Sequence, residues 1–168
     1  MSGAVSVRGL SPSARLFGVA LICLAAVGAA LVAQYRFDMQ PCPWCVLQRG
    51  IYLGIAVLCL LGALLPPRPV KLGLAGAAAL LALLGAASAT WQHLVAATSS
   101  SCNLTLADKI LNALNAEALF PALFQVTANC ADAAVSVLGI PFEYWSLALF
   151  ALLVAAAASA LVQLRQGA

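Results

Sequence analysis

The sequence predicts an all-α, polytopic membrane protein built as a bundle of four transmembrane helices, and its composition and charge distribution carry this prediction. Of 168 residues, 64% are apolar and only 8% are charged, whereas an ordinary soluble domain has about 25% charged residues. Eight basic and five acidic side chains are too few to cover a water-soluble chain of this length. The high apolar content excludes intrinsic disorder. A net charge of +3 without a basic patch excludes a nucleic-acid-binding protein.

Four apolar runs separated by charged residues define the predicted helices. A helix needs about 20 apolar residues to cross a hydrocarbon core about 30 Å thick. The runs do not alternate between apolar and polar residues, so a β-barrel is not expected. The first run is longer than the hydrophobic core of a usual signal peptide, and we expect it to remain as a span. The predicted spans are about 16–34, 46–65, 71–91 and 143–163.

The charged residues also predict an orientation. Four spans place both termini and the turn at 66–70 on one side of the membrane. The charged residues of that side are all basic: Arg8, Arg15, Arg68, Lys71 and Arg165. Short segments rich in Lys and Arg remain in the cytoplasm. We therefore expect cytoplasmic termini, with the segments at about 35–45 and 92–142 on the opposite, outer side.

The second outer segment contains the pattern of a short amphipathic helix. Leu106, Ile110, Leu111 and Leu114 recur at helical spacing, with polar residues opposite them. Such a helix either lies in the lipid headgroup region or packs on the other outer segment, and the sequence leaves both placements open. Without internal repeats or a second apolar core, residues 1–168 are expected to form a single membrane domain.

The six cysteines fall into two groups. Cys23 and Cys59 lie within predicted spans, where a cysteine behaves as a small hydrophobic residue. The other four lie on the outer side, two in each segment: Cys42, Cys45, Cys102 and Cys130. Disulfides persist in an oxidising, extracytoplasmic compartment, so two bridges are expected there. Four cysteines allow three connectivities, and spacing does not choose among them.

Cys42-Pro43-Trp44-Cys45 is a C-x-x-C motif, which indicates redox chemistry or half of a metal site. Zinc would require a second close cysteine pair or closely spaced histidines, and His93 is the one histidine of the chain. We therefore expect no metal. Haem attachment requires a histidine after the second cysteine, where this chain has Val46. The chain also lacks the alternating strands and helices of a thioredoxin domain.

The position of Cys45 favours a reactive thiolate. The second span begins near this residue, so free N–H groups and the positive end of the helix dipole face its sulfur. Arg49 follows four residues later on the same helical face. It lies at the predicted outer boundary of the bilayer, within reach of a sulfur anion and of the polar head of a lipid-soluble molecule. A cation at that depth is also explained as an interfacial anchor whose head extends to water, and the sequence leaves both interpretations open.

Thiol–disulfide exchange is the chemistry that fits these cysteines. Electrons that pass from one pair to the other need a final two-electron acceptor. The chain has no G-x-G-x-x-G motif for NAD or flavin, and an iron–sulfur cluster would consume the same cysteines. An acceptor dissolved in the membrane needs only an apolar crevice and a polar contact beside Cys45. Elimination therefore favours a quinone.

At this point the residues resemble a known family. The stretch from Pro41 to Arg49, P-C-P-W-C-V-L-Q-R, resembles the P-C-x-x-C-x-x-x-R motif of the DsbB family of bacterial disulfide bond formation proteins. The similarity extends to Trp91-Gln92-His93, to the widely spaced second cysteine pair, and to the segment 138–145 that leads into the last helix. A weaker similarity is to the vitamin K epoxide reductase-like family, in which the C-x-x-C motif lies late in the bundle.

The resemblance implies a role for each outer cysteine. Cys102 and Cys130 would form the bridge that meets a periplasmic DsbA-like thiol oxidase, with Cys102 forming the mixed disulfide. Electrons would then pass to Cys42 and Cys45, with Cys45 facing ubiquinone or menaquinone. The protein would thus be an oxidoreductase of the bacterial inner membrane.

The resemblance also implies two cofactor-binding residues. Arg49 matches the arginine that the family associates with the quinone, and His93 is expected either near the same head group or as a hydrogen-bonding residue at a helix end. Pro43-Trp44 departs from the best-known member and is expected to stiffen the turn and shift its reduction potential.

Two other classes compete with this interpretation. A structural membrane protein would use two inert disulfides to staple its outer segments. A reductive pathway that carries electrons outward would need reactive cysteines within the membrane, and Cys23 and Cys59 have no polar neighbour in sequence to activate them.

Overall fold

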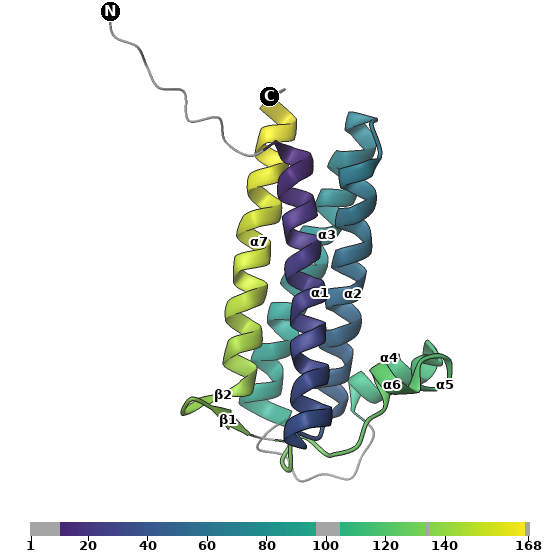
Figure 1. Ribbon diagram of the computed structural model, residues 1–168, viewed down its shortest axis with the longest axis vertical. Helices are drawn as coiled ribbons and strands as arrows, with labels where there is room; N and C mark the ends of the chain where they lie inside the picture. Colours follow the sequence, from purple (N-terminus) through teal and green to yellow (C-terminus); the bar gives the residue numbers. More distant parts are fainter. Residues whose placement is uncertain (1–10, 97–104, 134, 167–168) are drawn as a thin grey trace, which may run out of the picture.

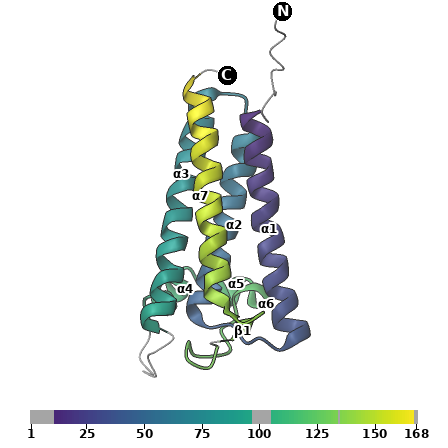
Figure 2. The same cartoon turned by 90° about the vertical axis from the view of Figure 1, so that its left-hand side faces the viewer.

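A computed structural model describes residues 11–96, 105–133 and 135–166. Four long helices form an elongated bundle in the described part of the chain (Figures 1 and 2): α1 (Pro12–Phe37), α2 (Pro43–Leu64), α3 (Arg68–Trp91) and α7 (Phe142–Gln166). Each contains an 18-residue window with a mean hydropathy between 1.8 and 2.6, long and apolar enough to cross a membrane. The four predicted spans are confirmed, and the protein is a multi-pass, all-α membrane protein.

Close helix packing depends on small side chains. α2 packs along α1 and α3, α3 packs along α7, and α1 also contacts α7. Fully buried alanines such as Ala20, Ala78 and Ala160 line these contacts, as expected where lipid provides no hydrophobic driving force between helices. The largest fully buried side chain, Phe150, occupies the space beside Gly85 and stacks on Tyr52 with ring centroids 4.2 Å apart.

At one end of the bundle, basic side chains form hydrogen bonds between neighbouring helices. α1 begins, α7 ends and the turn between α2 and α3 lies at this end (Figure 1). Lys71 donates to the Ser13 hydroxyl at 2.7 Å, and Arg68 donates to the Leu164 carbonyl at 2.6 Å. The start of α1, the end of α7 and the turn between α2 and α3 therefore lie at the same end of the bundle, as the count of four spans predicts.

The opposite end carries the short elements of the second outer segment. α3 continues into a π-helical turn, η1 (Gln92–Ala96), and the described residues resume with α4 (Leu106–Ala113), α5 (Ala116–Leu119) and α6 (Pro121–Phe124). The predicted amphipathic helix is therefore confirmed as α4, which Thr105 and Asp108 cap reciprocally. Its Leu111 is buried with Val46 of α2, whereas Leu106 and Leu114 remain exposed.

A small hairpin precedes α7 and was not predicted from the sequence. β1 (Ser136–Val137) pairs antiparallel with β2 (Ile140–Pro141), with Val137 opposite Ile140. Leu138 and Gly139 form the turn with φ values of 55° and 78°, as a two-residue type I′ hairpin requires. The Phe142 amide then donates to the Val135 carbonyl at 3.0 Å, which fixes where α7 begins.

Candidate active site

Cys42 and Cys45 lie together at the first turn of α2. Cys42 is the N-cap residue, and its sulfur accepts a hydrogen bond from the Cys45 backbone amide at 3.4 Å. Pro43 follows at the first helical position, where its missing N–H costs nothing. The two sulfur atoms are 3.0 Å apart and both thiols are free. The helix start thus holds the C-x-x-C pair in contact, ready for exchange.

Cys130 from the second outer segment meets the same pair. It is buried in one cluster with Cys42 and Trp44, and its thiol is hydrogen bonded to the thiol of Cys42. The Pro41 carbonyl accepts hydrogen bonds from Thr127 at 3.2 Å and from Ala128. These bonds tie the segment that carries Cys130 to the residue directly before Cys42.

The hydrogen bond between the two thiols shifts the pKa values of Cys42 and Cys130 in opposite directions. The hydrogen bond to Cys130, a second one to Cys45, and burial together raise the pKa of the Cys42 thiol well above its ordinary value. The same hydrogen bond from Cys42 outweighs burial and lowers the pKa of Cys130. Cys130 is therefore the better thiolate of this pair. Cys102, the fourth cysteine predicted for the site, lies outside the described residues.

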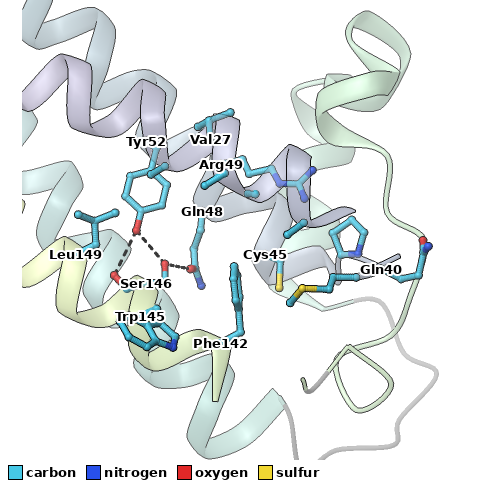
Figure 3. A pocket seen from close by; sticks show the side chains of 16 residues that line it. Val27, Gln40, Cys45, Gln48, Arg49, Tyr52, Phe142, Trp145, Ser146 and Leu149 are labelled. Atoms are coloured by element: carbon cyan, nitrogen blue, oxygen red, sulfur yellow. Dashed lines mark hydrogen bonds between the residues drawn. The ribbon is translucent and has the colours of Figure 1, made fainter. Parts of the chain in front are cut away.

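A cavity of about 220 Å³ opens beside Cys45, between α1 and α7, with α2 behind it (Figure 3). Four alanines of α1 at helical spacing, Ala26, Ala29, Ala30 and Ala33, leave room for it. Apolar side chains of α7 form the opposite wall. The polar side chains that line the cavity are Gln40, Cys45, Gln48, Arg49, Tyr52 and Ser146. The site is thus an apolar crevice with a reactive sulfur and a cation at its polar end.

Arg49 is buried, with only 5% of its surface exposed, so it is not an anchor whose head extends into water. Its Nη1 donates to the Gln34 side-chain oxygen at 2.7 Å and to the Leu123 carbonyl at 3.2 Å. These hydrogen bonds join α1, α2 and the second outer segment. The sequence placed Arg49 beside Cys45; in the structure both line the cavity, but the guanidinium is hydrogen bonded to other partners.

A chain of hydrogen bonds crosses the bundle and ends at Cys45. The Tyr52 hydroxyl lies 3.0 Å from the Ser146 hydroxyl, which donates to Gln48 Oε1 at 2.5 Å (Figure 3). Gln48 Nε2 donates to Gln92 Oε1 at 2.8 Å, and Gln92 Nε2 donates to the Cys45 sulfur at 3.2 Å. Residues from three helical elements therefore contact one another beside the reactive sulfur.

His93 lies outside the cavity that contains Cys45. Its Nδ1 is 2.8 Å from a Glu143 carboxylate oxygen, and its Nε2 is 3.0 Å from the Tyr144 hydroxyl. These residues line a second, smaller cavity of about 90 Å³ on another face of α7. The structure thus gives His93 the hydrogen-bonding position at a helix end, which was one of its two expected roles.

Sequence reasoning missed Gln34, Gln48, Gln92 and Ser146. One signal was available for the first two, because polar side chains within an apolar span almost always face the bundle interior or a functional site. Gln92 and Ser146 lie at span ends, where polar residues are common. Their contacts depend on how α3 and α7 are rotated against α2.

The helical bundle and its three clustered thiols define a membrane-embedded thiol–disulfide oxidoreductase. The family model for Disulfide bond formation protein DsbB matches residues 13–160. The chain belongs to the DsbB family of disulfide-forming oxidoreductases.

Two curated relatives carry the corresponding name. Disulfide bond formation protein B 1 of Pseudomonas syringae pv. syringae is 37% identical over 135 residues, which cover 79% of each chain. Disulfide bond formation protein B of Herminiimonas arsenicoxydans is 34% identical over 136 residues, which cover 80% of this chain and 85% of the relative.

Proposed function

We propose that this protein lies in the bacterial inner membrane, re-oxidises a periplasmic DsbA-like dithiol oxidase, and passes the electrons through its two cysteine pairs to a membrane quinone. The observation that carries the proposal is the apolar cavity between α1 and α7, which Cys45 and Arg49 line together. Family membership supports disulfide formation, and the cavity supports a lipid-soluble acceptor.

The charge distribution supports the proposed orientation. Lys71 and Arg68 fasten the end of the bundle where α1 begins and α7 ends, and Arg165 lies in the last turn of α7 at that same end. Short segments with such a basic excess stay in the cytoplasm. The cysteine cluster at the other end would then face the periplasm, where disulfides persist.

The contact between Cys130 and Cys42 supports a defined exchange sequence. A partner thiolate attacks Cys102 of an oxidised Cys102–Cys130 bridge, and Cys130 leaves as a thiolate. Cys130 then attacks Cys42 of the Cys42–Cys45 bridge, forming a Cys130–Cys42 bond while the Cys45 sulfur takes the electron pair of the broken bond. A backbone hydrogen bond from Trp44, which does not depend on a Cys42 proton, favours the Cys130 thiolate in both steps.

The remaining exchanges regenerate the outer bridge. The second thiolate of the partner attacks the mixed disulfide, so the partner leaves oxidised and Cys102 leaves as a thiolate. Cys102 attacks Cys130, which restores their bridge and releases Cys42. The net result is one oxidised partner and a reduced Cys42–Cys45 pair, with no electrons or protons unaccounted for.

The residues around the cavity fit a quinone. A volume of about 220 Å³ lies below the range of about 300–1,000 Å³ for drug-sized ligands, as suits a single substituted ring. Arg49 and Gln48 would hold the ring oxygens, and the α1 alanines would contact the ring. Bound ubiquinone or menaquinone would supply the two-electron, two-proton oxidation that returns Cys42 and Cys45 to a disulfide.

Quinone consumption tests this proposal. The purified protein in lipid nanodiscs is mixed with a reduced DsbA-like protein and a short-chain quinone, and quinone reduction is followed by ultraviolet absorbance. We expect one quinone reduced per dithiol oxidised, loss of the reaction in Cys45→Ser, and normal rates in Cys59→Ser, which changes a cysteine buried in the core. No quinone reduction by the unmodified protein, or equal rates in Cys45→Ser, would refute it. Inert stapling disulfides, the structural alternative, would oxidise no partner dithiol.

A further inference from the structure

The hydrogen-bond chain that ends at Cys45 has a single direction. Ser146 has one hydroxyl proton and donates it to Gln48 Oε1 at 2.5 Å, so its oxygen can only accept from the Tyr52 hydroxyl, which also donates to the Ser146 carbonyl at 3.3 Å. The Gln48 amide therefore turns its Nε2 toward Gln92 Oε1, 2.8 Å away. With its oxygen engaged, Gln92 has only its N–H group to offer the sulfur. From Ser146 onward, every donor in the chain points toward Cys45.

Three residues of the chain are shielded from water. Gln48, Gln92 and Tyr52 are 4%, 6% and 6% exposed, so water does not compete for their hydrogen bonds. In such surroundings consecutive hydrogen bonds strengthen one another. Gln92 also begins the π-helical turn η1, an irregularity often found at functional sites. The structure therefore fixes one amide N–H on one sulfur.

The geometry points to Gln92 as a catalytic residue that stabilises Cys45 as a thiolate, with Gln48 and Ser146 as the positioning residues that orient its amide. This inference rests on the proposed exchange, in which Cys130 attacks Cys42 and the sulfur of Cys45 leaves. The S–S bond breaks toward Cys45, which takes the electron pair, and Gln92 keeps its proton throughout. A better stabilised thiolate leaves faster.

The contact also selects which sulfur is attacked. Gln92 reaches Cys45 at 3.2 Å, whereas the N–H contact of Cys42 is the Cys45 backbone amide at 3.4 Å. The helix dipole and the charge of Arg49 favour a thiolate at both sulfurs at the start of α2. Gln92 therefore distinguishes the two positions, favouring Cys45 as the leaving group and Cys42 as the site of attack.

Alkylation of Cys45 tests this role without partner or quinone. In the full chain with Cys42→Ser, the rate at which iodoacetamide labels Cys45 is measured by mass spectrometry across a pH series. Arg49 and Cys130, the other titratable groups that act on Cys45, are the same in all variants. We expect Gln92→Leu to slow labelling at neutral pH about tenfold and to move the profile upward, since a hydrogen bond to a charged group is lost.

Further variants separate the effect of Gln92 from the effect of the residues that orient its amide. Gln92→Glu keeps an oxygen for Gln48 but removes the donor and adds a negative charge, so its profile should move further upward than that of Gln92→Leu; it also provides a folded variant if leucine destabilises the bundle. Ser146→Ala should slow labelling about two- to threefold, because the amide loses its orientation but keeps its donor. Ser159→Ala, in the same helix at the far end, should leave labelling unchanged.

Different results would contradict the role of Gln92, the role of the hydrogen-bond chain, and the proposed function. An unchanged profile in folded Gln92→Leu or Gln92→Glu overturns the role of Gln92, and equal effects of Ser146→Ala and Ser159→Ala overturn the role of the chain. Failure of the unmodified protein to reduce quinone counts against the proposed function instead, because the alkylation assay contains no quinone.

Discussion

Replacing Arg49 with methionine tests the polar end of the cavity. The guanidinium is 5% exposed and makes hydrogen bonds of 2.7 Å to Gln34 and 3.2 Å to the Leu123 carbonyl. A hydrogen bond to a charged group contributes about 1.5–3 kcal/mol. Losing both therefore lowers the free energy of unfolding by about 3–6 kcal/mol at most, and Arg49→Lys, which can keep the shorter bond, loses about half as much.

The same substitution has a separate effect on quinone use. If the guanidinium also donates to a quinone oxygen, removing that bond raises the KM for quinone on the order of ten- to a hundredfold. Exchange with the partner dithiol, measured in a single turnover without quinone, should also slow, because the charge of Arg49 favours the Cys45 thiolate that leaves in that step; the effect on quinone binding is therefore measured separately, as the KM.

Thermal unfolding and steady-state kinetics with saturating partner provide the two measurements. Arg36→Met is the matched control, since Arg36 is an exposed cation in the last turn of α1 at the same end of the bundle. An Arg49→Met protein that unfolds at a lower temperature but keeps its KM for quinone within twofold would refute the reasoning, because Arg49 would then serve only to join the helices.

Three further predictions concern the cavity, the core and the thiols. Ala30→Phe fills the cavity wall and should block quinone reduction while leaving dithiol exchange intact, as measured by stopped-flow mixing with and without quinone. Gly85→Ala places a methyl group against the ring of Phe150 and should lower the free energy of unfolding by about 1–3 kcal/mol in a denaturant titration. The lowered pKa of Cys130 and the raised pKa of Cys42 predict that Cys130 reaches half its maximal alkylation rate at lower pH than Cys42.

Each of these three predictions has a control variant or a result that would contradict it. Ala25→Phe adds the same ring to an exposed position of α1 that does not line the cavity, and an equal loss of quinone reduction there would remove the argument from cavity filling. Gly76→Ala meets no atom within 4 Å, so a destabilisation as large as that of Gly85→Ala would contradict the packing argument. An alkylation profile for Cys42 at lower pH than that of Cys130 would reverse the proton assignment.

The four spans and the amphipathic helix could be predicted because hydropathy and charge act locally. Charged residues bracket each apolar run, and a chain in lipid satisfies its backbone hydrogen bonds by forming helices there. The ends of the helices were harder to predict. α2 begins at Pro43 rather than near residue 46 because the Cys42 sulfur caps it, and capping by a cysteine has no strong sequence signal. The turn at Leu138, a residue that rarely adopts positive φ, was hidden for a similar reason.

The site was only partly predictable. The C-x-x-C motif located Cys42 and Cys45, and the position of Arg49 placed a cation nearby. The partners of Arg49 and the contact between Gln92 and Cys45 depend on the rotation of each helix about its axis. Helices that are apolar on every side carry little periodic signal for that rotation. Tertiary packing sets it, through contacts such as Gly85 with Phe150.

Photolabelling shows directly whether the cavity beside Cys45 receives the electron acceptor. A short-chain quinone with a photoactivatable group on its ring is bound to the protein in nanodiscs, irradiated, and mapped by peptide mass spectrometry. We expect labelling of residues 26–33 of α1 and 142–149 of α7, displaced by excess ubiquinone or menaquinone. Displaceable labelling confined to the smaller cavity around His93 would contradict it.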